Sequence, residues 1–156
     1  MKTIKTKIKD FMSDETRQLK PLIIIDYMQI INSSEMTDKQ AVDTNMTELK
    51  RIARDYKVVI IAISSFNRNN YYAEVGYESF KESGGIDYGA DVVLGLQFAV
   101  DYDGDNTQKN RKIHDKAATA YPRKLELRII KNRIFKSGGK VAFDYCSKYD
   151  CFYEEQ

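Results

Sequence analysis

Two unbroken runs of apolar, mostly β-branched residues constrain this chain more than any other feature. Residues 22–25 (LIII) and 58–63 (VVIIAI) do not alternate with polar residues, which is typical of parallel strands that are covered on both faces. Between them, residues 38–56 have apolar side chains at helical spacing. These are Val42, Met46, Leu49, Ile52 and Ala53. Strand, helix and strand in this order predict a right-handed βαβ unit with parallel strands.

The remaining apolar runs extend this unit into an α/β domain. An amphipathic helix is expected within residues 2–18, and a third strand at 92–94. A fourth strand is expected at 125–130. The Gly pair at 138–139 then predicts a hairpin turn into a strand at 141–145, with a last edge strand at 152–153. We therefore expect a mostly parallel sheet flanked by helices and finished by an antiparallel hairpin.

Composition limits the class of protein. With 156 residues and 42% hydrophobic residues, the chain is expected to form one domain over residues 1–156. Residues 101–123 are polar and rich in turn residues, so we expect a mobile loop there. No apolar run approaches the roughly 18–20 residues that span a bilayer, and the basic N-terminus has no apolar stretch behind it, so we expect no membrane association and a cytoplasmic location. Two cysteines and one histidine make a zinc site or a disulfide framework unexpected.

Charge is unevenly distributed along the chain. The formal net charge is +2, but residues 106–140 contain 11 basic and two acidic residues, a local charge of +9, which leaves −7 for the remainder. A field of this sign attracts polyanions such as nucleic acid. Like-charge runs are also often no more than solvated loops, so both interpretations stay open.

Asp26 directly follows the first apolar run. The carboxyl edge of a parallel sheet is where α/β proteins bind ligands. In nucleotide hydrolases an Asp at this position holds Mg²⁺, usually through a water. The pattern alone is weak, because many strands of such folds end in Asp.

Further segments follow the predicted strands in a specific order. Residues 26–31 (DYMQII) follow the first strand and residues 64–68 (SSFNR) follow the second. Residues 81–86 (KESGGI) precede a third strand that begins ADVV, and residues 130–133 (IKNR) end the fourth. From about Ile4 to Tyr153 this ordered set resembles the C-terminal ATPase domain of DnaB-type replicative helicases, which implies a RecA-like fold.

The resemblance implies a role for each matching residue on the nucleotide side. Asp26 corresponds to the Walker B acid that holds Mg²⁺ through a water, accompanied by Tyr27 and Gln29. The segment with Ser64, Ser65, Asn67 and Arg68 corresponds to the nucleotide-binding segment that senses the γ-phosphate. Ser65 stands where the family normally has Gln, and its shorter side chain puts phosphate sensing at that position in doubt.

It also implies DNA-binding and inter-subunit residues. Lys81, Glu82 and Gly84 match the loop that contacts single-stranded DNA, with Lys81 replacing the usual Arg and losing its bidentate fork. Lys131 and Arg133 match a catalytic pair whose Arg inserts into the ATP site of the neighbouring subunit as an arginine finger. From the residues alone, a solvated lysine is an alternative interpretation of Lys81, and pairing with a nearby carboxylate is the favoured interpretation of Arg133.

One expected element is missing from these 156 residues. No G-x-x-x-x-G-K-[ST] phosphate-binding loop is present, and residues 137–140 (SGGK) lie in a predicted hairpin turn. The resemblance therefore implies the C-terminal portion of a longer helicase, or a shortened relative, that is incomplete at its N-terminus. ATP and Mg²⁺ are expected cofactors of the intact protein, with neither bound tightly by this chain alone and no ATP hydrolysis by it.

The resemblance also implies partners. These are single-stranded DNA, like subunits in a hexameric ring, and a primase or a helicase loader, in a bacterial or phage-encoded, nucleoid-associated protein. The alternative hypothesis is a non-catalytic RecA-like module that binds single-stranded nucleic acid or a partner helicase through Lys81 and residues 106–140.

Overall fold

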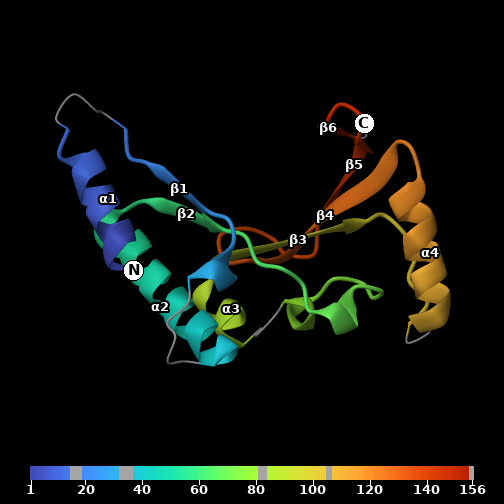
Figure 1. Ribbon diagram of the computed structural model, residues 1–156, viewed down its shortest axis with the longest axis horizontal. Coiled ribbons are helices and arrows are strands. Elements are labelled where there is room, and N and C mark those ends of the chain that lie inside the picture. The colour runs from blue at the N-terminus through green and yellow to red at the C-terminus, as the bar shows by residue number, and fades with distance from the viewer. Residues whose placement is uncertain (15–18, 32–36, 81–83, 105–106, 155–156) are drawn as a thin grey trace. The chain divides into compact units, whose positions relative to one another are not determined.

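The computed structural model describes residues 1–14, 19–31, 37–80, 84–104 and 107–154 (Figure 1). Two compact units divide the chain. The first contains Met1–Ser65 and Phe80–Ala90, and the second contains Phe66–Ser79 and Asp91–Gln156. The single domain expected over residues 1–156 stays a prediction. Among the helices described, none is both long enough and apolar enough to cross a membrane.

The first unit is built around the expected βαβ element. It contains helix α1 (Lys2–Met12), strand β1 (Leu22–Ile25), the 3-10 turn η1 (Met28–Ile30), helix α2 (Asp38–Tyr56), strand β2 (Val59–Ala62) and helix α3 (Gly84–Gly89). Strands β1 and β2 pair in parallel, with Leu22 opposite Val59 and Ile25 opposite Ala62. The predicted order of strand, helix and parallel strand is confirmed.

Helix α2 has clear start and stop signals. Thr37 and Gln40 form a capping box, in which the Gln40 N–H donates to Thr37 Oγ1 at 3.3 Å and the Thr37 N–H donates to Gln40 Oε1 at 3.2 Å. Lys57 ends the helix in the left-handed conformation at φ 51°. Of the predicted apolar stripe, Val42, Leu49 and Ile52 are buried and Met46 and Ala53 are half-buried. The helix is confirmed over residues 38–56.

Burial of the parallel strands differs from the expectation. Leu22 is 57%, Ile24 62% and Val59 65% exposed, whereas Ile23 and Ile25 are half-buried. Successive strand side chains point to opposite faces, so one face of the β1–β2 pair is covered and the other is open. The prediction that both faces are buried is wrong for these residues.

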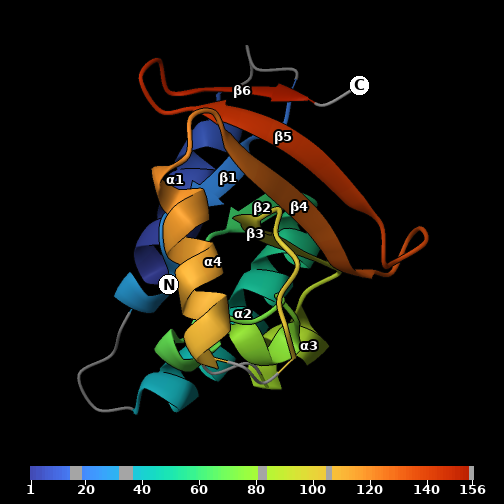
Figure 2. The ribbon, with the colours of Figure 1, turned by 90° about the vertical axis from the view of Figure 1, so that its right-hand side faces the viewer.

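The second unit is a four-stranded antiparallel sheet. It contains the 3-10 turns η2 (Arg68–Asn70) and η3 (Tyr77–Ser79), strand β3 (Val92–Phe98), helix α4 (Thr107–Thr119), and strands β4 (Arg123–Asn132), β5 (Lys140–Cys146) and β6 (Cys151–Glu154), with the strands in the order β3-β4-β5-β6 (Figure 2). The predicted β4–β5 hairpin and the edge strand β6 are confirmed. The antiparallel part is larger than expected, because β3 also pairs antiparallel with β4, which leaves β1–β2 as the parallel pair among the described strands.

The loop expected at 101–123 is corrected by helix α4, which occupies its centre. The helix is mostly polar, and its contact with the sheet includes His114. The His114 ring meets Phe98 at 4.8 Å and Tyr72 at 5.1 Å between centroids, both edge-on. The residue that α4 buries most deeply, Asn110 at 1% exposure, is also polar, so the hydrophobic pattern did not indicate a helix.

Candidate functional site at the carboxyl edge of the parallel strands

Backbone hydrogen bonds hold the segment that follows β1 against the end of β2. The Ile63 N–H donates to the Ile25 carbonyl at 2.9 Å, and the Met28 N–H donates to the Ile63 carbonyl at 2.8 Å. Met28 is 1% exposed and anchors η1 in the core of the unit. Asp26 lies between these points with an exposed side chain, at the carboxyl edge where the sequence places a ligand-binding acid.

Gln29 and Ser64 are brought together at this edge. Gln29 Nε2 donates to Ser64 Oγ at 2.8 Å, which links the turn after β1 to the residue that follows Ile63. The other polar atom of the amide, Gln29 Oε1, is buried and has no hydrogen-bond partner in the described structure. Most buried polar atoms in folded proteins have a hydrogen-bond partner, so this atom is an exception. Ser65, the next residue, is exposed.

Asn67 is used within its own loop. Its side chain accepts from the Asn70 N–H at 2.9 Å and donates to the Glu78 carbonyl at 2.6 Å, and its N–H donates to the Ser79 carbonyl at 2.8 Å. This closes the segment 67–79 into an ordered loop. The Arg68 side chain lies at the start of η2. The structure therefore gives Asn67 a structural role, and its predicted role in nucleotide binding stays a prediction, as does that of Arg68.

The predicted catalytic pair lies at the end of β4. Lys131 is opposite Val93 in the β3–β4 register. Arg133 follows the strand and contacts Asp91 twice: Arg133 Nη1 donates to Asp91 Oδ1 at 3.2 Å, and its N–H donates to the Asp91 carbonyl at 2.9 Å. The two side chains are 45% and 51% exposed. The alternative interpretation of Arg133 as the partner of a carboxylate is thus observed in this structure.

Two of the three predicted DNA-binding residues, Lys81 and Glu82, lie outside the described residues. The third, Gly84, begins α3. Helix α3 packs closely on α2 because of two glycines one turn apart. A Cβ at Gly85 would collide with the Asp43 side chain, and one at Gly89 would meet Met46 Cε at 2.9 Å. Larger residues at these positions would force the helices apart.

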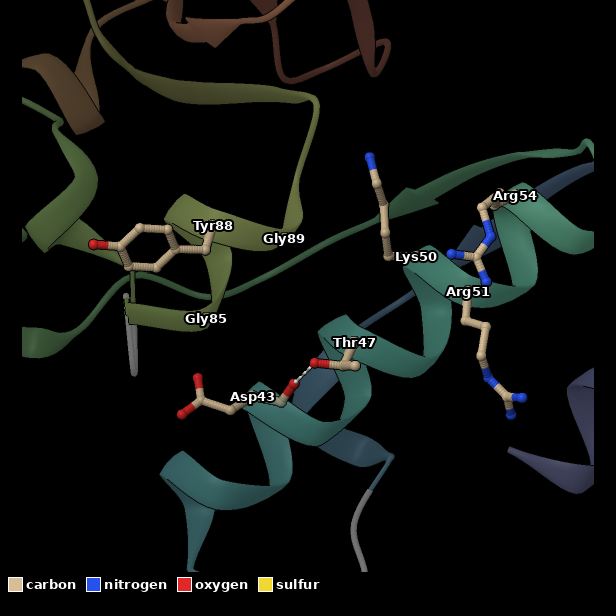
Figure 3. Close-up of a pocket in the computed structure, with 8 residues that line it drawn as sticks. All are labelled: Asp43, Thr47, Lys50, Arg51, Arg54, Gly85, Tyr88 and Gly89. Carbon is tan, nitrogen blue, oxygen red and sulfur yellow. Dashed lines mark hydrogen bonds between the residues drawn. The ribbon is translucent and has the colours of Figure 1, made fainter.

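Sequence reasoning did not identify an open hollow of about 410 Å³ between α2 and α3 (Figure 3). Tyr88, 81% exposed, lies on the α3 side, and Lys50, Arg51 and Arg54 lie on the α2 side. Arg51 and Arg54 are already paired with Glu48 and Asp55, so their charges are offset within the helix. The spacing of Gly85 and Gly89 with three cations on the facing helix was the available signal.

Carboxylates offset part of the positive charge of the basic segment 106–140. At least five of its 11 cations have carboxylate partners in the structure. These pairs are Lys109–Asp103, Lys124–Asp144, Arg128–Glu74, Arg133–Asp91 and Lys140–Glu126. Several of the carboxylates come from outside the segment, which a charge count along the sequence does not reveal. The local charge of the folded segment is therefore smaller than +9, and the alternative hypothesis of a nucleic-acid module stays a prediction.

A magnesium ion fits this site in part. The described residues contain no group of three or more His, Cys, Asp or Glu placed to hold a metal. Asp26 offers one exposed carboxylate, an oxygen ligand of the kind Mg²⁺ prefers, and Mg²⁺ commonly keeps several waters and takes its other ligands from phosphates. The residues present therefore suit a metal shared with a nucleotide better than a metal bound by protein alone.

Comparison with known proteins assigns this chain to a family. The model of the DnaB-like helicase C-terminal domain matches residues 1–154. The replicative DNA helicase DnaB of Mycoplasma pneumoniae is 30% identical over 140 residues, which cover 84% of this chain and 28% of that protein. A probable replicative DNA helicase of Trieres chinensis is 30% identical over 112 residues, covering 68% and 24%. The chain thus spans about a quarter of the length of these relatives.

Solved structures agree on the fold. A DnaB-like replicative helicase, reported with its interactions with primase, superposes with a TM-score of 0.71 at 22% identity over 95% of this chain and 33% of its own. A second structure, solved as an ATPase domain, superposes with a TM-score of 0.69 at 21% identity over 95% and 49%. The RecA-like class expected from the sequence is confirmed by these two structures.

Proposed function

The chain belongs to the DnaB-like helicase C-terminal domain family, and from this premise we propose that it supplies the C-terminal part of an ATP-dependent DNA helicase that unwinds duplex DNA during replication. The observation that carries the proposal is the arrangement at the carboxyl edge of β1 and β2. There an exposed Asp26 and a Gln29–Ser64 hydrogen bond lie side by side in the chain segment that the family model matches.

Asp26 is proposed to hold Mg²⁺ through a water. When bound, the ion would supply positive charge against the phosphates of ATP. The contribution of this chain is to keep the carboxylate exposed and at a fixed place. The hydrogen bonds of Met28 and Ile63 to the strand ends do this without using the Asp26 side chain.

Gln29 and Ser64 are proposed to report on the nucleotide. Their hydrogen bond connects the turn that carries Asp26 with the end of β2, so a shift at one is transmitted to the other. Ser65 is too short to replace the Gln of the family, so Gln29 and Ser64 are the stronger candidates.

Arg133 is proposed as the arginine finger, with Lys131 beside it. An arginine finger contributes about 10³–10⁵ in rate, or roughly 4–7 kcal/mol. An exposed ion pair such as Arg133–Asp91 contributes only about 0–1 kcal/mol. The ion pair with Asp91 therefore positions Arg133 in the absence of a phosphate. It is weak enough for Arg133 to exchange Asp91 for a phosphate on a neighbouring subunit.

Partners follow from the same proposal. The loop that contains Lys81, Glu82 and Gly84 would contact single-stranded DNA, with Lys81 on its phosphates. Like subunits would form a hexameric ring. A primase is proposed because a structural neighbour is a DnaB-like helicase that interacts with primase. We place the protein in the cytoplasm, where replicative helicases act.

A chimaeric helicase tests the proposal. Residues 1–154 replace the matching segment of the Mycoplasma pneumoniae DnaB, and Mg²⁺-dependent ATP hydrolysis and duplex unwinding are measured. Asp26→Ala should abolish both activities. Asp55→Ala, which removes an exposed acid on α2, should leave them intact. Equal activity of the Asp26→Ala and parent chimaeras would refute the assignment.

A further inference from the structure

The hairpin between β5 and β6 places the two cysteines of the chain opposite each other. In the β5–β6 register Cys146 is the partner of Cys151, and this pair closes the hairpin. Figure 2 shows β5 and β6 joined by a turn. The turn between them is ordered, because the Tyr149 N–H donates to the Cys146 carbonyl at 3.1 Å and Asp150 has φ 50°. Both thiols are free and half-buried.

Directly opposed residues of antiparallel strands suit a disulfide. Their Cα atoms are about 4.5–5.5 Å apart, within the roughly 4.4–6.8 Å that disulfides span. Their Cβ atoms are about 4.5–5.5 Å apart, at or slightly above the roughly 3.5–4.5 Å of a disulfide. Only a small closure of the hairpin end is therefore needed, and deviations of this kind make a bond easier to reduce again.

Because they are directly opposed in the register, the two cysteine side chains lie on one face of the sheet, and tyrosines lie beside them. The Cys151 thiol donates to Tyr153 Oη at 3.5 Å. That hydrogen bond raises the pKa of Tyr153, and Cys146 adds to the shift. Burial, with the nearby Cys146 and Cys151, raises the pKa of Tyr121. Tyr121 and Tyr153 are more than half exposed, so reagents reach this face from solvent.

We propose that Cys146 and Cys151 form a reversible dithiol–disulfide couple that is oxidised by low-molecular-weight disulfides. In the first step the thiolate of one cysteine attacks the oxidant disulfide, forms a mixed disulfide and releases one thiol. In the second step the other cysteine attacks the protein sulfur of that mixed disulfide, forms the Cys146–Cys151 bond and releases a second thiol. The protein loses two electrons and two protons, and both are recovered in the two thiols released.

A structural disulfide framework joins distant parts of a chain, whereas this bond would join two adjacent strands. The bond closes a turn of four residues, so it ties β6 to β5. Strand β6 is one of the two edge strands of the sheet. Oxidation would hold this edge strand in register, and reduction would release the constraint.

Oxidised glutathione tests the proposal on the full chain. The reduced protein is incubated with it, then analysed by thiol titration and by intact mass under non-reducing conditions. The free thiol count should fall from two to zero, and the monomer mass should fall by two hydrogen atoms. Cys146→Ser and Cys151→Ser should each instead keep one glutathione adduct.

A control variant tests whether closure requires the two cysteines to be directly opposed in the strand register, and not only close in sequence. Phe152 faces Tyr145 on the other side of the sheet, with ring centroids 4.6 Å apart. A variant with Cys151→Ser and Phe152→Cys moves the thiol by one residue and therefore to the opposite face. It should accumulate glutathione adducts and not close. Two adducts on the parent chain, disulfide-linked dimers, or equally ready closure in the register variant would each overturn the proposal.

Discussion

Arg133 and Asp91 are joined by a side-chain hydrogen bond of 3.2 Å and by a backbone hydrogen bond of 2.9 Å from the Arg133 N–H to the Asp91 carbonyl. The backbone bond fixes where the chain leaves β4. The side-chain bond is exposed to solvent and is therefore weak. This arrangement positions the guanidinium and leaves it able to move to a stronger acceptor.

The first prediction concerns this pair. Asp91→Asn removes the charge partner of Arg133 and keeps the backbone bond. In the chimaeric helicase we expect ATP hydrolysis to stay within about fivefold of the parent, since the lost interaction is about 1 kcal/mol at most. Arg133→Lys should lower hydrolysis far more, because lysine keeps the charge and loses the planar fork. Loss of activity in Asp91→Asn to the level of Arg133→Lys would show that Asp91 itself is required.

Acid stability is predicted to depend on Glu48. Hydrogen bonds from Arg51 and Lys5 lower the pKa of the Glu48 carboxyl from 4.5 to about 2, and the bond to Lys5 joins α1 to α2. A group whose pKa is lowered on folding adds stability above its unfolded pKa and loses it as the pH falls through the folded pKa. We expect the free energy of unfolding to decrease between about pH 4.5 and pH 2.

The matched measurement is urea unfolding across this pH window in parent and Glu48→Gln proteins. The variant should lose part of the pH dependence and be less stable at neutral pH. Parallel curves for the two proteins would contradict the assignment of this window to Glu48.

Contact between α2 and α3 is predicted to require glycine at position 85. In Gly85→Ala the new methyl group would lie 3.0 Å from the Asp43 Cα, a backbone atom that cannot move aside easily. Overpacking of this kind costs about 1–3 kcal/mol. Gly139→Ala is the control, because its methyl group would meet Ile129 Cδ1 at an ordinary 3.5 Å. Chemical denaturation of both variants checks the difference, and equal stabilities would refute it.

Much of this fold was predictable from local pattern. The strand at 22–25, the helix at 38–56 and the β4–β5 hairpin follow from an unbroken apolar run, apolar side chains at helical spacing and a Gly turn. Helix α4 was not predictable in this way, because its sheet contacts include His114, held between two aromatic rings. Antiparallel pairing of β3 was also hidden, since strand direction depends on long-range contacts.

The candidate site also has a part that the sequence predicts and a part that it does not. The place of Asp26 at the end of a strand follows from the sequence. The Gln29–Ser64 hydrogen bond and the Arg133–Asp91 pair join residues 35 and 42 positions apart, and only the folded chain brings them together. The folded chain also brings together the cations of the basic segment 106–140 and the carboxylates that offset their charge.

Binding of single-stranded DNA is predicted to depend on Lys81. Anisotropy titrations of a labelled oligonucleotide at several salt concentrations should give a straight log–log plot. Lys81→Ala should weaken binding and reduce the slope by about one, the value for one phosphate contact. Lys20→Ala, an exposed lysine elsewhere in the first unit, is the control and should keep the parent slope. An unchanged slope in Lys81→Ala would remove this residue from the DNA contact.

Complementation between two inactive variants tests the central claim most directly. If Asp26 serves its own ATP site and Arg133 serves that of the neighbouring subunit, an Asp26→Ala subunit still donates a working Arg133. An equal mixture of Asp26→Ala and Arg133→Ala chimaeras should then regain up to about a quarter of the parent ATP hydrolysis, the share of interfaces with both residues intact. Activity no higher than the average of the two separate variants would contradict the account.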